Sequence, residues 1–113
     1  MNMSVIRPVA AQFEAYNKHD INAFIDCFSE DFRGYRMPAE TPSTIGKSAL
    51  REFYISNRFN NPELRAELIS RTVLGNKVFD HEFIHGLSPA PLESIAVFEI
   101  TNDLISTAWF YFP

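Results

Sequence analysis

The fold is decided by the stretch Phe13-Glu14-Ala15-Tyr16-Asn17-Lys18-His19-Asp20-Ile21-Asn22-Ala23-Phe24. It predicts a helix that runs into a tight polar turn and restarts as a second helix, with Asp20 as the N-cap. The second helix is expected over residues 21–28, whose apolar positions share one face. An acidic run, Ser29-Glu30-Asp31, ends that helix and leads into a strand over residues 32–37. Two adjacent helices that feed a sheet predict a small α+β domain with a pocket.

The remaining elements follow from helical spacing and strand alternation. An apolar stripe beginning at Val5 predicts the first helix, and Gly46-Lys47-Ser48 opens a third helix that stops near Asn60-Asn61-Pro62. From Leu64 onward the period changes to that of strands. The expected strands are residues 64–74, 77–86, 92–101 and 104–112. Three helices followed by an antiparallel meander predict an α+β fold with the helices on one face, and residues 1–113 are expected to form a single domain.

Composition narrows the class of protein. The chain has 113 residues, enough for a hydrophobic core without disulfides or metals, and its eleven Phe predict a core, pocket or interface built on aromatic area. The formal charge is −4 and the basic residues are scattered singly, so neither nucleic acid nor an anionic membrane surface is an expected partner. No run approaches the roughly 20 apolar residues that span a bilayer.

The single cysteine, Cys27, cannot form an intrachain disulfide. Its surroundings, Phe24-Ile25-Asp26-Cys27-Phe28, favour a small buried hydrophobic residue over a nucleophile. A protein without disulfides is typical of a reducing compartment, so a cytoplasmic protein is expected.

Four segments together resemble one known superfamily. They are residues 15–21, residues 28–31, residues 46–54, and Val97-Phe98-Glu99-Ile100 leading to Leu104-Ile105. In these segments the chain resembles the nuclear transport factor 2-like superfamily, and within it the SnoaL-like and ketosteroid isomerase-like proteins. The resemblance implies a cone-shaped, curved antiparallel sheet wrapped around three N-terminal helices, also described as cystatin-like. It further implies a cavity for a small apolar ligand, and a homodimer through the outer sheet face.

The residues that a ketosteroid isomerase needs are absent from the matching positions. The place of its tyrosine falls on Gln12, that of its carboxylate base on Arg36, and that of its protonated acid on Ala96. A guanidinium cannot accept a proton near neutral pH, and alanine cannot donate a hydrogen bond. Steroid isomerisation by the familiar mechanism is therefore not expected, although the three positions remain candidate binding residues.

Strand parity selects further cavity residues. If Ala96 faces the cavity, so does Phe98, and on the last strand Phe110 then lies inside while Trp109 lies outside. Tyr16 and Tyr54 have hydroxyls on buried helix faces. These hydroxyls either donate to a ligand oxygen or complete the core.

Strand 77–86 offers two alternatives. Either Asp80 and Glu82 point inward, or the opposite face does, in which case His81 enters the cavity and becomes the base. We favour the inward carboxylates, because the phenylalanines of the other face can cover a dimer interface. Arg36 is then the expected countercharge. A carboxylate in an apolar cavity has a raised pKa, which suits a general acid or base near neutrality.

Two functions remain open. The first is an enzyme, of isomerase or hydrolase type, in which Asp80, Glu82 or His81 moves a proton on a small apolar compound that contains oxygen. Epoxide hydrolases on a related fold use two carboxylates flanking an arginine, and this chain has the same residue types. The second is a non-catalytic ligand-binding or dimerisation module. No cofactor is expected, and no metal either, because adjacent residues of a strand point to opposite faces and cannot converge on one ion.

Overall fold

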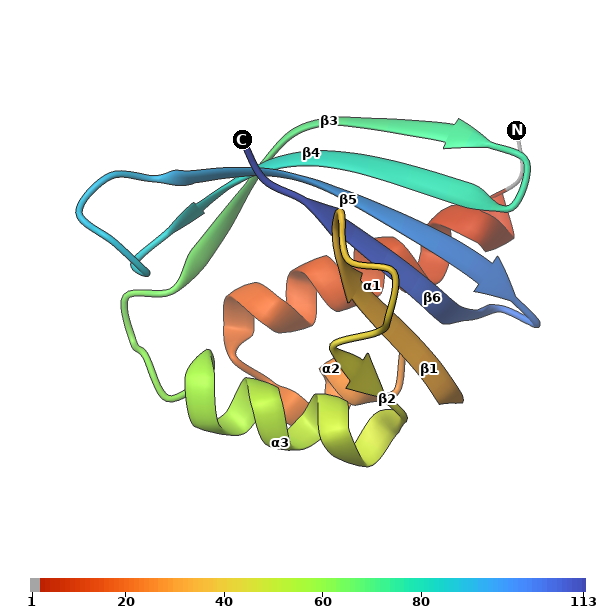
Figure 1. Cartoon of the computed structure of the whole chain (residues 1–113), viewed down its shortest axis with the longest axis horizontal. Coiled ribbons are helices and arrows are strands. Elements are labelled where there is room, and N and C mark those ends of the chain that lie inside the picture. Colours follow the sequence, from red (N-terminus) through yellow and green to blue (C-terminus); the bar gives the residue numbers. More distant parts are fainter. Residues whose placement is uncertain (1–2) are drawn as a thin grey trace.

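A curved sheet lies over three helices in the computed structural model, which describes residues 3–113 (Figure 1). The helices are α1 (Met3–Lys18), α2 (Ile21–Ile25) and α3 (Lys47–Asn57). The strands are β1 (Phe28–Arg36), β2 (Thr44–Ile45), β3 (Arg65–Leu74), β4 (Lys77–His85), β5 (Leu92–Thr101) and β6 (Leu104–Tyr111). No helix in this part of the chain has the length and apolar character needed to cross a membrane.

The sheet combines the predicted meander with a second, unpredicted pairing. Its strand order is β2-β1-β6-β5-β4-β3, and β3 to β6 pair antiparallel in sequence, as expected. β1 joins β6 in parallel, and the short β2 pairs with β1 at the edge. The sheet curves around the helices without closing into a barrel (Figure 1). The structure therefore confirms the predicted α+β fold.

The second helix is shorter than predicted. α2 ends at Ile25, and Phe28 is already the first residue of β1. The backbone N–H of Ile105 donates to the carbonyl of Cys27 at 2.9 Å, so pairing with β6 replaces the next helical turn. Phe28 keeps the buried position expected of it, because its ring packs 4.9 Å from that of Phe24. The acidic run Ser29-Glu30-Asp31 consequently lies in an irregular part of β1 and does not end the helix.

The turn between α1 and α2 ties the helices to the sheet. Asp20 is the N-cap, as predicted, and its side chain accepts from the backbone N–H of Ala23 at 3.2 Å. Asn17 both donates to the carbonyl of Ala66 and accepts from its N–H, at 3.0 and 2.7 Å. The Asn17 amide thereby satisfies backbone groups at the start of β3 that an adjacent strand would otherwise satisfy.

A β-bulge in β3 decides which side chains face the helices. Leu68 is paired with Glu82, but the next pair is Ser70 with His81, so Ile69 is an extra residue and is 46% exposed. The bulge reverses the alternation along β3 and sets Arg71, rather than Ser70, opposite Asp80. Arg71 thus reaches the inner face of the sheet.

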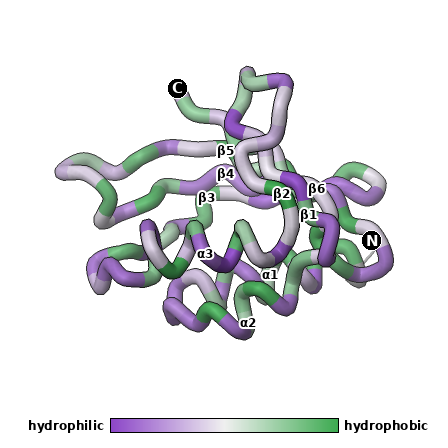
Figure 2. The backbone as a smooth tube through the Cα atoms, turned by 60° about the horizontal axis from the view of Figure 1, so that its bottom comes forward, coloured by the Kyte–Doolittle hydropathy of each residue, from purple (hydrophilic) through white to green (hydrophobic). Residues whose placement is uncertain are grey.

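The core lies between the helices and the inner sheet face. Figure 2 shows hydrophobic residues interspersed with polar ones along the chain, and burial alternates along β5 and over residues 77–83 of β4. An aromatic cluster from α1, α2, α3 and β1 fills the helical side, with Tyr16, Phe24 and Tyr54 in mutual ring contact. Cys27 is buried as predicted, and burial raises the pKa of its thiol to about 11. The thiol therefore stays protonated near neutral pH.

The outer sheet face has no helix over it in the described chain. Phe79, Val97 and Trp109 are register partners in a row across β4, β5 and β6, and Tyr35 of β1 extends the row. All four are partly exposed, whereas their neighbours along each strand are buried or line the interior. A contiguous apolar row of this kind is typical of an interaction surface. The homodimer through this face stays a prediction.

Substituting Val97 by Lys tests that dimer. A charge at the centre of the row would have to be desolvated in the interface, so Val97→Lys is expected to yield a monomer. Sedimentation equilibrium measures the mass. Thr101→Lys, at the exposed end of the same strand, should leave a dimer intact. A wild-type protein that remains monomeric at high concentration would contradict the prediction.

Candidate functional site

A cavity of about 160 Å³ opens between the helices and the inner sheet face. Phenylalanine is the commonest residue in its wall, and several polar and charged side chains also line it. All seven predicted binding residues line it: Gln12, Tyr16, Arg36, Tyr54, Ala96, Phe98 and Phe110. Their placement confirms the predicted strand parity, while their part in binding stays a prediction.

Glu82 is the acidic residue that lines this cavity. It points inward from β4, as predicted, and is 9% exposed. Its carboxylate forms no hydrogen bond or ion pair with another side chain of residues 5–113. Burial raises the pKa of Glu82 to about 7, the nearby charge of Asp80 adds to the shift, and Arg71 opposes it. Glu82 therefore exchanges a proton readily near neutral pH.

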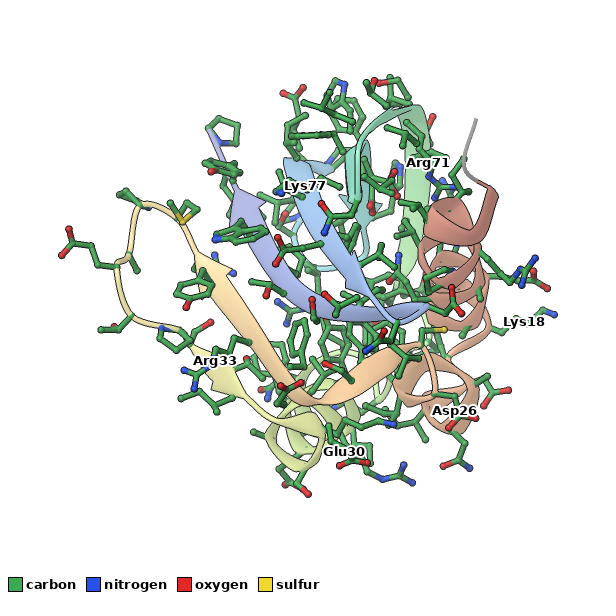
Figure 3. The ribbon with its side chains drawn as sticks, turned by 90° about the vertical axis from the view of Figure 1, so that its right-hand side faces the viewer. Lys18, Asp26, Glu30, Arg33, Arg71 and Lys77 are labelled. Atoms are coloured by element: carbon green, nitrogen blue, oxygen red, sulfur yellow. The ribbon has the colours of Figure 1, made fainter. Side chains whose placement is uncertain are left out.

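Asp80 faces the same way but is held differently. It is 0% exposed, and it accepts two hydrogen bonds from Arg71, at 2.7 Å from Nε and 2.9 Å from Nη2. Figure 3 shows Arg71 on β3, which packs against α1. The expectation that Arg36 supplies the countercharge is wrong, since Arg36 instead stacks on Phe112, with 4.4 Å between its guanidinium carbon and the ring centroid.

Arg71, the partner of Asp80, is one candidate site residue that sequence reasoning missed. Strict alternation from the apolar Ala66 and Leu68 places residue 71 on the outer face, and only the bulge at Ile69 turns it inward. A signal for the bulge does exist in the apolar pattern, which moves from even positions to the odd position of Val73. Leu74 continues the even pattern, however, and the structure leaves it exposed. The two patterns could not be separated from the sequence.

The histidines lie away from the cavity. His81 is on the outer face, with its ring Nε2 2.7 Å from a carboxylate oxygen of Glu93, and His85 contacts Glu67 at 3.0 Å in the same way. The structure thus does not bring His81 to the cavity that Glu82 lines. Among the described residues, no three His, Cys, Asp or Glu side chains come together as a metal site.

Two tyrosines supply hydroxyl groups opposite the sheet. Tyr16 of α1 and Tyr54 of α3 line the cavity, with ring centroids 6.2 Å apart in an edge-to-face arrangement. Burial raises the pKa of Tyr54 to about 12 and that of Tyr16 further, and the charge of Glu82 contributes in both cases. Both hydroxyls therefore remain protonated and can donate a hydrogen bond to a ligand oxygen.

Gln12 and Arg58 are two further polar residues of the lining. The side-chain amide of Gln12 donates to the carbonyl of Val9 at 3.1 Å, so one of its two N–H groups is already used within α1. Arg58, just beyond α3, was not predicted as a site residue. Its guanidinium lies over the ring of Phe53, 4.9 Å from the centroid.

Residues 9–108 match the SnoaL-like domain family, and the chain belongs to that family. No curated protein matches the chain in sequence. The family match confirms the superfamily resemblance seen in the sequence.

Solved structures support the same fold. An uncharacterised cystatin-fold protein from Novosphingobium aromaticivorans is 22% identical, with a TM-score of 0.86 and coverage of 96% of this chain and 98% of that one. A proposed ketosteroid isomerase from Kribbella flavida is 14% identical, with a TM-score of 0.85 and coverage of 98% and 78%. An epoxide hydrolase-like protein from Mycobacterium tuberculosis, described as an LEH-like epoxide hydrolase, is 16% identical, with a TM-score of 0.78 and coverage of 98% and 84%. At these identities the likeness shows the fold alone.

Removing Arg71 should destabilise the protein strongly. In Arg71→Met the buried Asp80 loses its countercharge, which typically costs about 3–5 kcal/mol of unfolding free energy. Lys77→Met is the matched control on β4, because it breaks the partly exposed pair with Glu99 and should cost about 1 kcal/mol or less. Urea unfolding measures both. Equal losses in the two variants would contradict the structural importance of the buried pair.

The titration of Glu82 should make stability depend on pH. Between pH 4.5, the ordinary value, and about 7, the folded state retains a proton on Glu82 that the unfolded state has released. Stability should therefore fall as pH rises through this window, by on the order of 3 kcal/mol relative to Glu82→Gln. Urea unfolding across the window measures the difference. The exposed Glu63→Gln control should follow the wild type, and parallel curves for wild type and Glu82→Gln would exclude the effect.

Proposed function

We propose that this protein is an enzyme that uses Glu82 as a general acid and base on a small compound containing oxygen. The observation that supports this is a carboxylate with a pKa of about 7 on the wall of an apolar cavity, without a partner among the side chains of residues 5–113. A catalytic group is most effective when its pKa lies near the operating pH, because both of its forms are then available.

Proton transfer beside a carbonyl needs only the groups present. The Glu82 carboxylate takes a proton from a carbon next to the carbonyl, and the electrons of that C–H bond form a C=C bond. The carbonyl π electrons move to the oxygen, where Tyr16 or Tyr54 stabilises the developing charge by donating a hydrogen bond. In a ketone that carries a C=C bond beside that carbon, Glu82 then returns the proton to the far carbon of this C=C bond. The carbonyl re-forms, the remaining π electrons become the C=C bond conjugated with it, and the product is an isomer of the starting compound.

Epoxide opening is the hydrolytic variant of the same chemistry. Glu82 takes a proton from a water molecule as that water attacks a ring carbon, and the C–O bond of the ring breaks. The alkoxide that leaves accepts the proton back from Glu82, so the products are a diol and the original carboxylate. The buried pair of Asp80 and Arg71 beside Glu82 supports this variant, because it supplies the two-carboxylate and arginine set used by epoxide hydrolases on a related fold.

The ion pair acts through Glu82 in this proposal. Asp80 is absent from the cavity wall, so it serves as a positioning residue whose charge helps to raise the pKa of Glu82. Arg71 neutralises Asp80 and keeps the pKa of Glu82 from rising further. The pair thereby adjusts the proton affinity of the catalytic carboxylate.

Cavity size limits the substrate. An apolar cavity of about 150 Å³ holds one benzene ring, so the 160 Å³ observed here suits a single-ring or short-chain compound. A steroid has four fused rings and is too large for it. The residue changes at positions 12, 36 and 96 and the cavity volume thus agree in disfavouring a conventional ketosteroid isomerase.

A panel of single-ring enones, cyclic ketones and epoxides tests the proposal. Glu82→Gln should lower kcat/KM by roughly 10²–10⁴-fold. The pH–rate profile of the wild type should bend near pH 7, and in Asp80→Asn the bend should move to lower pH, because Arg71 then acts on Glu82 without its partner. The control variant Glu63→Gln should match the wild type in both measurements.

Two results would reject the proposal. One is turnover in Glu82→Gln equal to that of the wild type. The other is ligand binding without turnover of any substrate in the panel, which would establish the alternative, a ligand-binding module in which the same apolar wall holds a metabolite.

A further inference from the structure

Two arginines stand where the cavity meets solvent. Arg36, at the end of β1, lines the cavity and is also exposed. Arg58 lines the cavity and is half-buried just beyond α3. Both guanidiniums act electrostatically on the Tyr54 hydroxyl and lower its pKa, against the stronger effect of burial, so both lie within range of the same point on the cavity wall.

Neither arginine forms an ion pair with another side chain of residues 5–113. The ion pairs within that range involve other cations. Arg58 donates one N–H to the carbonyl of Asn57 at 2.9 Å, which leaves further N–H groups on the same guanidinium. The cavity wall thus has two unpaired cations against one carboxylate, Glu82, in a chain whose formal charge is −4.

Both guanidiniums are also held in place. Arg36 stacks on Phe112 and Arg58 on Phe53, and each of these phenylalanines lines the cavity as well. Stacking on a ring occupies the face of a guanidinium and leaves its N–H edges available. An arginine whose N–H edges remain available is suited to bind a carboxylate with two parallel hydrogen bonds.

We propose that the ligand of this cavity is an anion, a single-ring or short-chain carboxylate whose charged group lies between Arg36 and Arg58. This inference rests on the proposed function and specifies its substrate class. The carboxylate binds at the mouth, and the apolar body of the molecule enters the phenylalanine-lined interior, where an oxygen-bearing carbon reaches Glu82. The opposite orientation would place two negative charges together whenever Glu82 is ionised.

Benzoate and benzamide form a matched pair of probes, since they share size and shape and differ in charge. Isothermal titration calorimetry on the full-length wild type should show benzoate binding at least tenfold more tightly than benzamide. Arg36→Gln and Arg58→Gln should each reduce that preference, and the double variant should abolish it. Arg33→Gln, on the same strand (Arg33 is labelled in Figure 3), removes an equal charge outside the cavity lining and should change neither affinity. Added salt should weaken benzoate binding alone.

Three outcomes would overturn the inference. They are equal affinities for benzoate and benzamide, a benzoate preference that survives in the double variant, and no binding of either probe up to about 10 mM. All three arginines are exposed or half-buried, and circular dichroism melting confirms that each variant is folded.

The Glu82→Gln variant separates this inference from the proposed function. It should retain the benzoate preference, because both arginines proposed to bind the carboxylate are still present in this variant. Turnover that survives in Glu82→Gln while the benzoate preference persists would reject only the catalytic role. Turnover that depends on Glu82 without any charge preference in binding would reject only the anionic ligand.

Discussion

The buried pair between Arg71 and Asp80 is the interaction on which the chemistry of this cavity depends. β4 presents two carboxylates on its inner face, and without a cation near them they would compete for one proton. The bidentate hydrogen bonds from Arg71 make them unequal, because Asp80 receives a countercharge and Glu82 does not. Two groups with nearly the same intrinsic acidity thus acquire different environments two residues apart, a common way of assigning separate tasks to paired carboxylates.

Charge is distributed unevenly along the cavity. The acidic Glu82 lies on the sheet wall and the basic Arg36 and Arg58 lie at the opening, with the Tyr54 hydroxyl within range of all three. The space between these groups is apolar, so their fields are screened less than they would be in water. A ligand with charge at one end and an uncharged polarisable oxygen at the other would have one favoured orientation. The proposed catalysis would gain from this, because an orientation fixed on binding need not be found again during reaction.

Much of the fold could be predicted because local signals determine it. Gly75, between β3 and β4, and Asn102, between β5 and β6, adopt positive φ in tight turns. The residue types that allow such turns therefore also mark the ends of the strands. The parallel pairing of β1 with β6 could not be predicted, since it joins distant segments and depends on the tertiary fold. The same limit applied to the site. Glu82 was accessible from alternation, but Arg71 required a bulge at Ile69, and a period of two does not show where a residue has been inserted.

The register of the sheet explains why Glu82 lacks a countercharge. On β4, Asp80 has Arg71 on one side and Ala96 on the other, while Glu82 has Leu68 and Ser94. Neither Leu68 nor Ser94 can carry a charge near neutral pH. Arg71 is therefore the one cation among these four register partners, and it lies opposite Asp80. Without the extra residue in β3, Ser70 would oppose Asp80 and the alternation would direct Arg71 to the outer face. Both carboxylates would then be buried without a cation, a costly arrangement. The bulge therefore gives the buried Asp80 its cation and brings Arg71 to where it keeps the pKa of Glu82 from rising further.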